Sequence, residues 1–223
     1  LGVYAEVFPH DVSAERLNQH HPRGIIYSGG PNSVYETDAP QIPAHLITSY
    51  QPMLGVCYGM QAMTQALGGI VAPSQQREYG HASIRQTHSA PLFDGIPENS
   101  RVWMSHGDRI ERPPDGFVPL AVSDNSPYAA MGDVARGRYG VQFHPEVVHT
   151  EFGTQILHNF VFRVCGCAAK WSPVAFIDEA VRNIRERVGD ERVLLALSGG
   201  VDSAVAGTLL HRAIGSQLVS VFV

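Results

Sequence analysis

The sequence has few cysteines, no long apolar run and no excess of basic residues. Its 223 residues contain 3 cysteines, too few for a disulfide framework, and Cys165 and Cys167 are too close in sequence to pair comfortably. No uncharged apolar stretch reaches the roughly 18 residues of a membrane span. A net charge of −5 argues against the clustered basic surface that nucleic acid requires. We therefore expect a reducing, cytoplasmic environment, with neither a membrane nor nucleic acid as a partner.

Apolar runs that end in glycine or polar residues predict an α/β fold. Three of these runs predict buried strands, at residues 24–27, 53–56 and 139–143. Helical spacing follows the second run at Gln61–Leu67 and the third run from Phe152 to Val164. Strands that alternate with helices predict a largely parallel sheet covered on both faces. Residues 70–135 are instead rich in Pro, Gly, Ser and Asp, which predicts antiparallel strands and loops.

A second domain is predicted to begin near residue 170. Ser172 is a candidate N-cap for a helix that starts at Pro173, and apolar residues follow at helical spacing as Val174, Ile177, Val181, Ile184 and Val188. A strand at Val193–Leu197 comes next. We therefore expect one domain at residues 1–170 and the start of another at 171–223.

Both ends of the sequence lack the signals of a domain boundary. The chain opens on an alternating run, Val3, Ala5 and Val7, which is typical of a strand, and no initiator methionine precedes it. Residues 218–223 form a strand-like apolar run that stops without a turn. We therefore expect the chain to be a piece of a longer protein.

A candidate nucleophile lies at Cys57, in the pattern Gly-Val-Cys-Tyr-Gly. At a strand-to-helix turn the flanking glycines, Gly55 and Gly59, allow a sharp reversal that lifts the thiol clear of the sheet. The helix N-terminus beneath the sulfur then favours a thiolate. A thiol nucleophile also needs an imidazole with an orienting acceptor, and His144 and Glu146 directly follow a predicted strand. A small buried hydrophobe is the alternative interpretation of Cys57.

A candidate phosphate site follows the strand at residues 193–197. Ser198, Gly199 and Gly200 lead into a predicted helix at 204–212, which places backbone N–H groups at a helix N-terminus where they can bind phosphate. The loop is not a Walker A motif, because Gly-Lys-Ser/Thr is absent. A flexible turn is the alternative.

The first set of motifs resembles the class I glutamine amidotransferases. The matching segments are Ser28-Gly29-Gly30-Pro31, residues 55–61 and residues 144–146, in the order of that family. The resemblance implies a flavodoxin-like mixed sheet with helices on both faces. It also implies a further strand and helix ahead of residue 1, so the domain is expected to lack them here.

The resemblance also assigns roles to individual residues. It implies that Cys57 is the nucleophile, His144 the general base and then acid, and Glu146 the group that orients His144. It implies an oxyanion hole made by backbone N–H groups of Gly30 and Tyr58, and glutamine-binding residues at Gln61, Ser105, His106 and Asp108. A turn at Gly29–Gly30, a surface amide at Gln61 and a polar turn at 105–108 are the alternatives.

The second set of motifs resembles the N-type ATP pyrophosphatases, which adenylylate a substrate and release pyrophosphate. The resemblance implies an incomplete Rossmann-like domain of the adenine nucleotide alpha hydrolase type. It assigns ATP binding to Ser198, Gly199, Gly200, Val201, Asp202, Ser203 and Ala204. It also places Asp202 near Mg²⁺.

A glutaminase followed by this loop is similar to the family of glutamine-hydrolysing GMP synthetases. That likeness implies glutamine, XMP and ATP as substrates and a homodimer for the intact enzyme. Another two-domain amidotransferase, or a fragment with no catalytic role, are the alternatives.

Overall fold

The computed structural model describes residues 1–48 and 52–223, and it divides the chain into two compact units. The larger unit comprises residues 6–167, and the smaller comprises residues 1–5 together with 168–223. This division lies near residue 170, and the assignment of domains at 1–170 and 171–223 stays a prediction for the intact protein.

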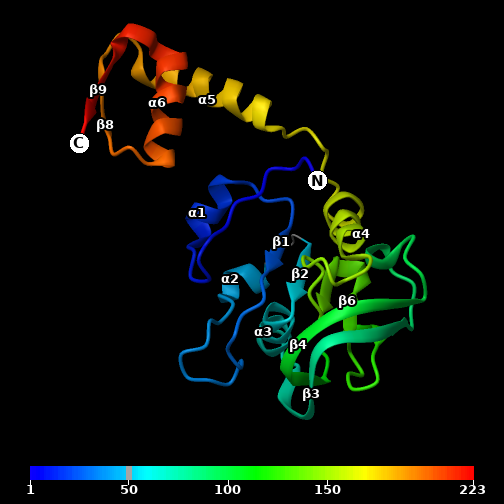
Figure 1. Ribbon diagram of the computed structural model, residues 1–223. Coiled ribbons are helices and arrows are strands. Elements are labelled where there is room, and N and C mark those ends of the chain that lie inside the picture. The colour runs from blue at the N-terminus through cyan, green and yellow to red at the C-terminus, as the bar shows by residue number, and fades with distance from the viewer. Residues whose placement is uncertain (49–51) are drawn as a thin grey trace. The chain divides into compact units, whose positions relative to one another are not determined.

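The larger unit is built on a seven-stranded sheet in the order β1-β2-β7-β6-β5-β3-β4 (Figure 1). The strands are β1 (Ile25–Tyr27), β2 (Met53–Val56), β3 (Ile70–Gln86), β4 (Asn99–Arg112), β5 (Val118–Val122), β6 (Ala130–Asp133) and β7 (Arg138–Val141). Strands β1, β2 and β7 run parallel, and every other pairing is antiparallel. The prediction of a largely parallel sheet is therefore wrong, because short connections within residues 70–135 join neighbouring strands without a crossover helix. The antiparallel character predicted for that region is confirmed.

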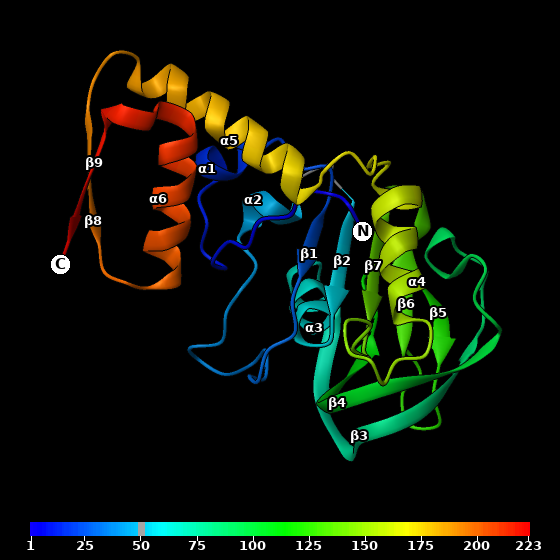
Figure 2. The ribbon, with the colours of Figure 1, turned by 45° about the horizontal axis from the view of Figure 1, so that its top comes forward.

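Helices of the larger unit flank its parallel strands (Figure 2). They are α1 (Ala14–Gln19), α2 (Ala44–Ile47), α3 (Tyr58–Ala66) and α4 (Gly153–His158), with 3₁₀ turns at Pro91–Phe93 and Val134–Arg136. The helix predicted after the second strand is confirmed as α3, and Gly68 follows its end with a φ of +85°. After α4 the chain continues as a π-helical segment, Asn159–Val164. The apolar residues from Phe152 to Val164 recur every four positions, which exceeds the roughly 3.6 residues per turn of an α-helix. This spacing is compatible with the larger number of residues per turn of a π-helix.

The core of the larger unit surrounds its parallel strands. All four residues of β2 are buried, and Tyr139, Val141 and Phe143 from the β7 segment are at most 1% exposed. Strands buried on both faces are expected to be apolar throughout rather than alternating. Because β1, β2 and β7 run parallel, their carboxyl ends meet at one sheet edge, where the motif residues follow each strand.

The alternating run at Val3, Ala5 and Val7 forms no strand. Val7 is 97% exposed, so alternation in the sequence is not matched by a buried face. A period of two predicts a strand only where one face packs against a core and a neighbouring strand supplies hydrogen bonds.

The smaller unit contains the predicted helix, strand, loop, helix and strand in order. These elements are α5 (Pro173–Val188), β8 (Val193–Leu197), α6 (Val201–Ile214), a 3₁₀ turn (Gly215–Gln217) and β9 (Leu218–Phe222). Ser172 is the N-cap of α5, since its Oγ accepts from the Ala175 N–H at 3.1 Å. Strands β8 and β9 pair in parallel on either side of the α6 crossover. In the described parts of the chain, no helix combines the length and apolar character that crossing a bilayer requires.

Candidate active site

Cys57 lies at the sharp turn between β2 and α3 that the Gly-x-Cys-x-Gly pattern predicts. Its φ of 50° and ψ of −110° are unusual for a residue with a side chain. Both flanking glycines are required by close backbone contacts. A Cβ on Gly55 would lie 2.6 Å from the backbone N of Met60, and a Cβ on Gly59 would lie 2.1 Å from the backbone O of Tyr27.

We expect Gly59→Ala to lower the free energy of unfolding by about 3 kcal/mol, because its Cβ can be accommodated only if α3 moves away from β1. Urea unfolding of the 223-residue chain measures this change. Gly107→Ala is the matched control, since a Cβ there would meet no atom closer than 3.6 Å. Equal losses in the two variants would contradict the requirement for glycine at the turn.

His144 directly follows the strand segment next to β2 and contacts Cys57. Its Nδ1 lies 2.7 Å from Glu146 Oε1, and its side chain is 18% exposed. The hydrogen bond with Cys57 is the main cause that raises the pKa of His144 to about 9; burial acts in the opposite direction, and the hydrogen bond with Glu146 adds to the rise. The protonated imidazole is therefore favoured beside the sulfur at neutral pH.

Gly29 allows this contact between imidazole and thiol. A Cβ at Gly29 would lie 3.1 Å from His144 Cε1 and 3.7 Å from Cys57 Cβ, so a side chain there would crowd both groups. Gly29 therefore does more than form a turn.

Two residues that the sequence did not single out hold the backbone of His144. The His144 N–H donates to the Trp103 carbonyl at 3.0 Å, and the His144 carbonyl accepts from Thr150 Oγ1 at 2.6 Å. Thr150 Oγ1 also accepts from the Trp103 N–H at 3.1 Å. A buried threonine six positions after His144 carries no recognisable signal, because its role depends on β4.

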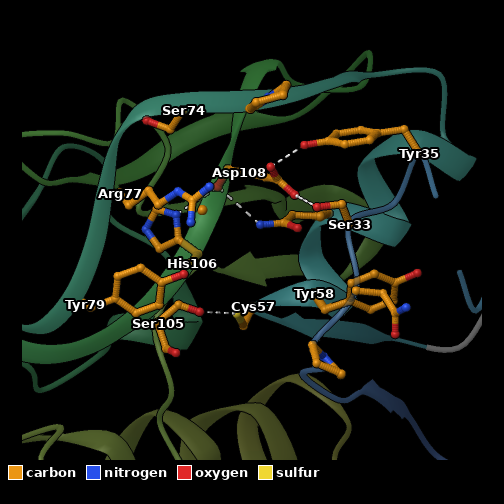
Figure 3. Close-up of a pocket in the computed structure, with 16 residues that line it drawn as sticks. Ser33, Tyr35, Cys57, Tyr58, Ser74, Arg77, Tyr79, Ser105, His106 and Asp108 are labelled. Atoms are coloured by element: carbon orange, nitrogen blue, oxygen red, sulfur yellow. Dashed lines mark hydrogen bonds between the residues drawn. The ribbon is translucent and has the colours of Figure 1, made fainter.

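A polar pocket of about 480 Å³ opens beside Cys57 (Figure 3). The predicted residues that line it come from three separate segments of the chain and are Gly30, Cys57, Tyr58, Gln61, Ser105, His106 and Asp108. A Cβ at Gly30 would lie 3.5 Å from the Tyr58 ring, so these two residues are adjacent. Tyr58 is the first residue of α3, and its N–H therefore has no acceptor within the helix. The oxyanion hole at Gly30 and Tyr58 stays a prediction.

Asp108 is held by two hydroxyl groups that no sequence motif indicates. Ser33 Oγ donates to Asp108 Oδ2 at 2.6 Å, and the Tyr35 hydroxyl donates to Asp108 Oδ1. Residues 105–108 lie within β4, so their interpretation as a polar turn is wrong. Gln61 is 3% exposed, so its interpretation as a surface amide is also wrong. The glutamine-binding role of these residues stays a prediction.

The candidate phosphate loop connects β8 to α6. Gly199 has a φ of +77°, which favours glycine, and α6 begins immediately after Gly200. Ser198 Oγ donates to Ser203 Oγ at 3.2 Å, and Ser203 Oγ donates to the Gly200 carbonyl at 3.0 Å. The N–H groups of the first turn, which includes Asp202, have no acceptor within the helix and can bind an anion.

Two family models match the chain in succession. The model of glutamine amidotransferase class-I matches residues 1–164, and the model of NAD synthase matches residues 173–223. A protein from Thermomicrobium roseum named GMP synthase (glutamine-hydrolyzing) is 57% identical over 222 residues, which are 99% of this chain and 42% of that relative. A protein of the same name from Dehalococcoides mccartyi is 53% identical and is covered to 42% of its length. The chain thus spans less than half of these relatives.

Solved structures agree with these matches. A crystal structure from Thermoplasma acidophilum, described as that of a putative GMP synthase subunit, is 29% identical, with a TM-score of 0.65 over 72% of this chain and 80% of that one. A glutamine amidotransferase from Thermotoga maritima is 21% identical, with a TM-score of 0.52 over 88% of this chain and 80% of that one, and supports the fold alone. The mixed-sheet amidotransferase fold that the resemblance implies is confirmed. Because the amidotransferase model covers well over half of the sequence, the chain belongs to the class I glutamine amidotransferase family.

Proposed function

We propose that this chain hydrolyses the side-chain amide of glutamine at Cys57. The observation that carries the proposal is the contact between Cys57 and His144, whose Nδ1 is hydrogen-bonded to Glu146. A thiol at a strained turn, an imidazole that can hold its proton and a carboxylate that orients the ring together suit acyl transfer. This arrangement of thiol, imidazole and carboxylate favours a catalytic role over the alternative of a fragment with none.

Each group has one task in the proposed reaction. The Cys57 sulfur attacks the amide carbon, and the carbonyl oxygen becomes an oxyanion that the N–H groups of Gly30 and Tyr58 stabilise. His144 gives its proton to the departing nitrogen, so the C–N bond breaks, ammonia leaves and a thioester remains. A water molecule then attacks the thioester with His144 as its base, which releases glutamate and restores the thiol. Release of glutamate from glutamine by the chain tests this proposal.

We expect His144→Ala to reduce kcat for glutamine hydrolysis by about 10³-fold or more, because it removes the proton carrier. Glu146→Gln should cost less, at most about 100-fold, because the amide still contacts the ring. The same change should bring the pKa of His144 below about 9, since the hydrogen bond with Glu146 raises it. Steady-state kinetics and NMR titration of the imidazole measure the two effects. A loss from Glu146→Gln as large as that from His144→Ala would give Glu146 more than an orienting role.

We further propose that the chain belongs to a longer protein that makes GMP. The support is the name GMP synthase carried by relatives at 57% and 53% identity, together with the order of the two matched family models. In the proposed reaction ATP adenylylates the C2 oxygen of XMP and releases pyrophosphate, and ammonia from glutamine then displaces AMP to give GMP. We propose that this longer protein uses glutamine, XMP and ATP as substrates. We also propose that it forms a homodimer and is located in the cytoplasm. Because both relatives are named GMP synthase, the comparisons do not favour the alternative that the longer protein is another two-domain amidotransferase.

We propose that Mg²⁺ accompanies ATP at the loop between β8 and α6. Asp202 is exposed in the first turn of α6 and precedes Ser203 in the sequence. The described residues contain no group of three or more His, Cys, Asp or Glu that could hold a metal. One carboxylate suits Mg²⁺, because this ion usually takes its other ligands from phosphate oxygens and water. When bound, Mg²⁺ neutralises phosphate charge.

A further inference from the structure

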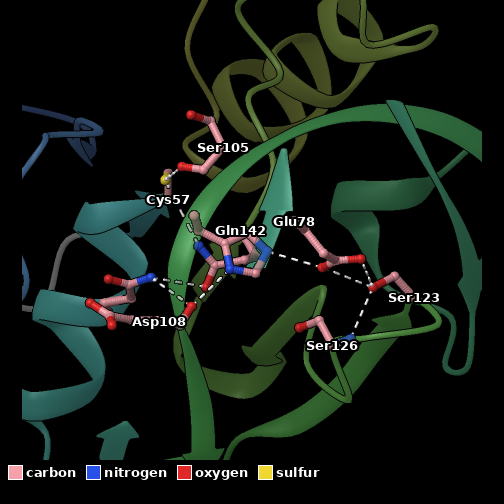
Figure 4. Close-up of polar contacts among 9 residues, drawn as sticks. Cys57, Glu78, Ser105, Asp108, Ser123, Ser126 and Gln142 are labelled. Atoms are coloured by element: carbon pink, nitrogen blue, oxygen red, sulfur yellow. Dashed lines mark hydrogen bonds and ion pairs between the residues drawn. The ribbon is translucent and has the colours of Figure 1, made fainter. Parts of the chain in front are cut away.

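Gln142 is a buried residue to which the proposed mechanism assigns no role. It lies between Val141, the last residue of β7, and Phe143, and its side chain is fully buried. Its Nε2 donates to Cys57 Sγ at 3.8 Å, and its Oε1 accepts from Gln61 Nε2 at 3.3 Å. A single buried amide therefore joins the candidate nucleophile to a residue that lines the pocket (Figure 4).

The direction of these hydrogen bonds is determined by the backbone carbonyl of Asp108. That oxygen accepts from His106 Nδ1 at 2.8 Å and from Gln61 Nε2 at 3.3 Å. A carbonyl can only accept, so the Gln61 amide must direct its NH₂ group toward it. The same NH₂ group has a second hydrogen, which it donates to Gln142 Oε1. The NH₂ group of Gln142 must then face Cys57.

The sulfur of Cys57 also faces an acceptor. The thiol donates to the Ser105 carbonyl at 3.5 Å, and this oxygen would repel a negatively charged sulfur. The N–H of Gln142 has the opposite effect, because a donor stabilises the charge that develops when the thiol loses its proton. The N–H group of Gln142 therefore offsets the repulsion between the Ser105 carbonyl and a negatively charged Cys57 sulfur.

We propose that Gln142 is a positioning residue of the glutaminase reaction. It directs an N–H group at the Cys57 sulfur and favours the reactive thiolate, and its Oε1 is a second acceptor for the Gln61 amide, which the Asp108 carbonyl already orients. This proposal rests on the proposed glutaminase function for its biological meaning. The contact with the sulfur does not depend on glutamine and is tested without it.

Alkylation of Cys57 by iodoacetamide is the first test. The sulfur displaces iodide, so the rate reports how readily a reactive thiolate forms, and mass spectrometry of the Cys57 peptide distinguishes it from Cys165 and Cys167. We expect Gln142→Met, which keeps the length of the side chain but has no donor, to slow alkylation about tenfold. Gln142→Glu should slow it about 100-fold at a pH high enough to ionise the buried carboxyl group, because the carboxylate only accepts and repels the thiolate.

A matched control is available at Gln86. Its Nε2 donates to the carbonyls of Ile96 and Pro97, away from the pocket, so Gln86→Met should leave the alkylation rate unchanged. In glutamine hydrolysis Gln142→Met should lower kcat about tenfold and change KM by less than about threefold, because Gln61 stays bonded to Asp108. If the wild-type chain does not hydrolyse glutamine, the proposed function fails, whereas the alkylation rates still decide the role of Gln142.

A measurement on the wild-type chain covers the case in which the Gln142 variants do not fold. Alkylation of Cys57 should shift the side-chain NH₂ resonances of Gln142 in a ¹⁵N–¹H spectrum, because their acceptor changes. The resonances are assigned from their contacts with neighbouring backbone protons. Wild-type alkylation rates in folded Gln142→Met and Gln142→Glu, or NH₂ resonances that do not move on alkylation, would overturn the proposal.

Discussion

Replacing Cys57 with alanine is expected to abolish glutamine-dependent GMP formation in the longer protein and to preserve the reaction with added ammonia. The thiol forms the proposed thioester, so its loss should reduce glutamine hydrolysis by about 10³-fold or more. Ammonia added to the solution needs no thiol, because in the proposed reaction XMP is adenylylated at the other site. GMP formation, followed by chromatography with glutamine or with an ammonium salt, measures the two routes.

Cys165→Ala is the matched control for this variant. Cys165 is also buried, and burial raises the pKa of its thiol to about 12, so it is a poor nucleophile. We expect both routes to survive in Cys165→Ala. Loss of the ammonia route in Cys57→Ala, with a normal Tm, would mean that the two reactions do not occupy separate sites.

The parts of the active site that could be predicted are those determined by local sequence. The turn at Cys57 depends on glycines within two positions, and Glu146 reaches His144 from two residues away. The contact between Cys57 and His144 was predicted because recognisable motifs carry both residues, whereas contacts of residues outside these motifs could not be predicted. Ser33 lies 75 positions from Asp108, and Gln142 lies 85 positions from Cys57, so their meeting depends on the completed sheet.

Strand β4 shows why part of the fold was also difficult to predict. Its buried positions alternate from Ser100 to Ile110 and include His106 and Asp108, which is the period of a strand with one face in the core. His106 and Asp108 occupy two of these positions, so the sequence there resembles a polar turn. Their burial is compensated by partners from β3 and from the loop after β1, namely Glu78, Ser33 and Tyr35. The polar character of His106 and Asp108 is therefore the reason that this strand is difficult to recognise in the sequence.

Asp202→Ala is expected to remove GMP formation with glutamine and with ammonia alike. Both routes of the proposed reaction need the adenylylated intermediate, and we propose that Asp202 helps to hold the ATP phosphates with their Mg²⁺. Loss of this carboxylate should therefore reduce either rate by about 100-fold or more. Glutamine hydrolysis at Cys57 does not use ATP chemistry, so it should continue in the variant. The longer protein with saturating XMP and ATP allows the three rates to be compared.

Asp190→Ala separates a local charge effect from a role at the loop. Asp190 is an exposed aspartate in the turn between α5 and β8, so its removal changes the charge of the same unit by the same amount. We expect it to leave both amination rates unchanged, because the candidate anion site consists of the loop after β8 and the first turn of α6. Normal ammonia-dependent GMP formation in Asp202→Ala would contradict the assignment of this carboxylate. If both variants lost the amination rates, the effect would come from net charge, because each removes one negative charge but only Asp202 lies in the candidate anion site.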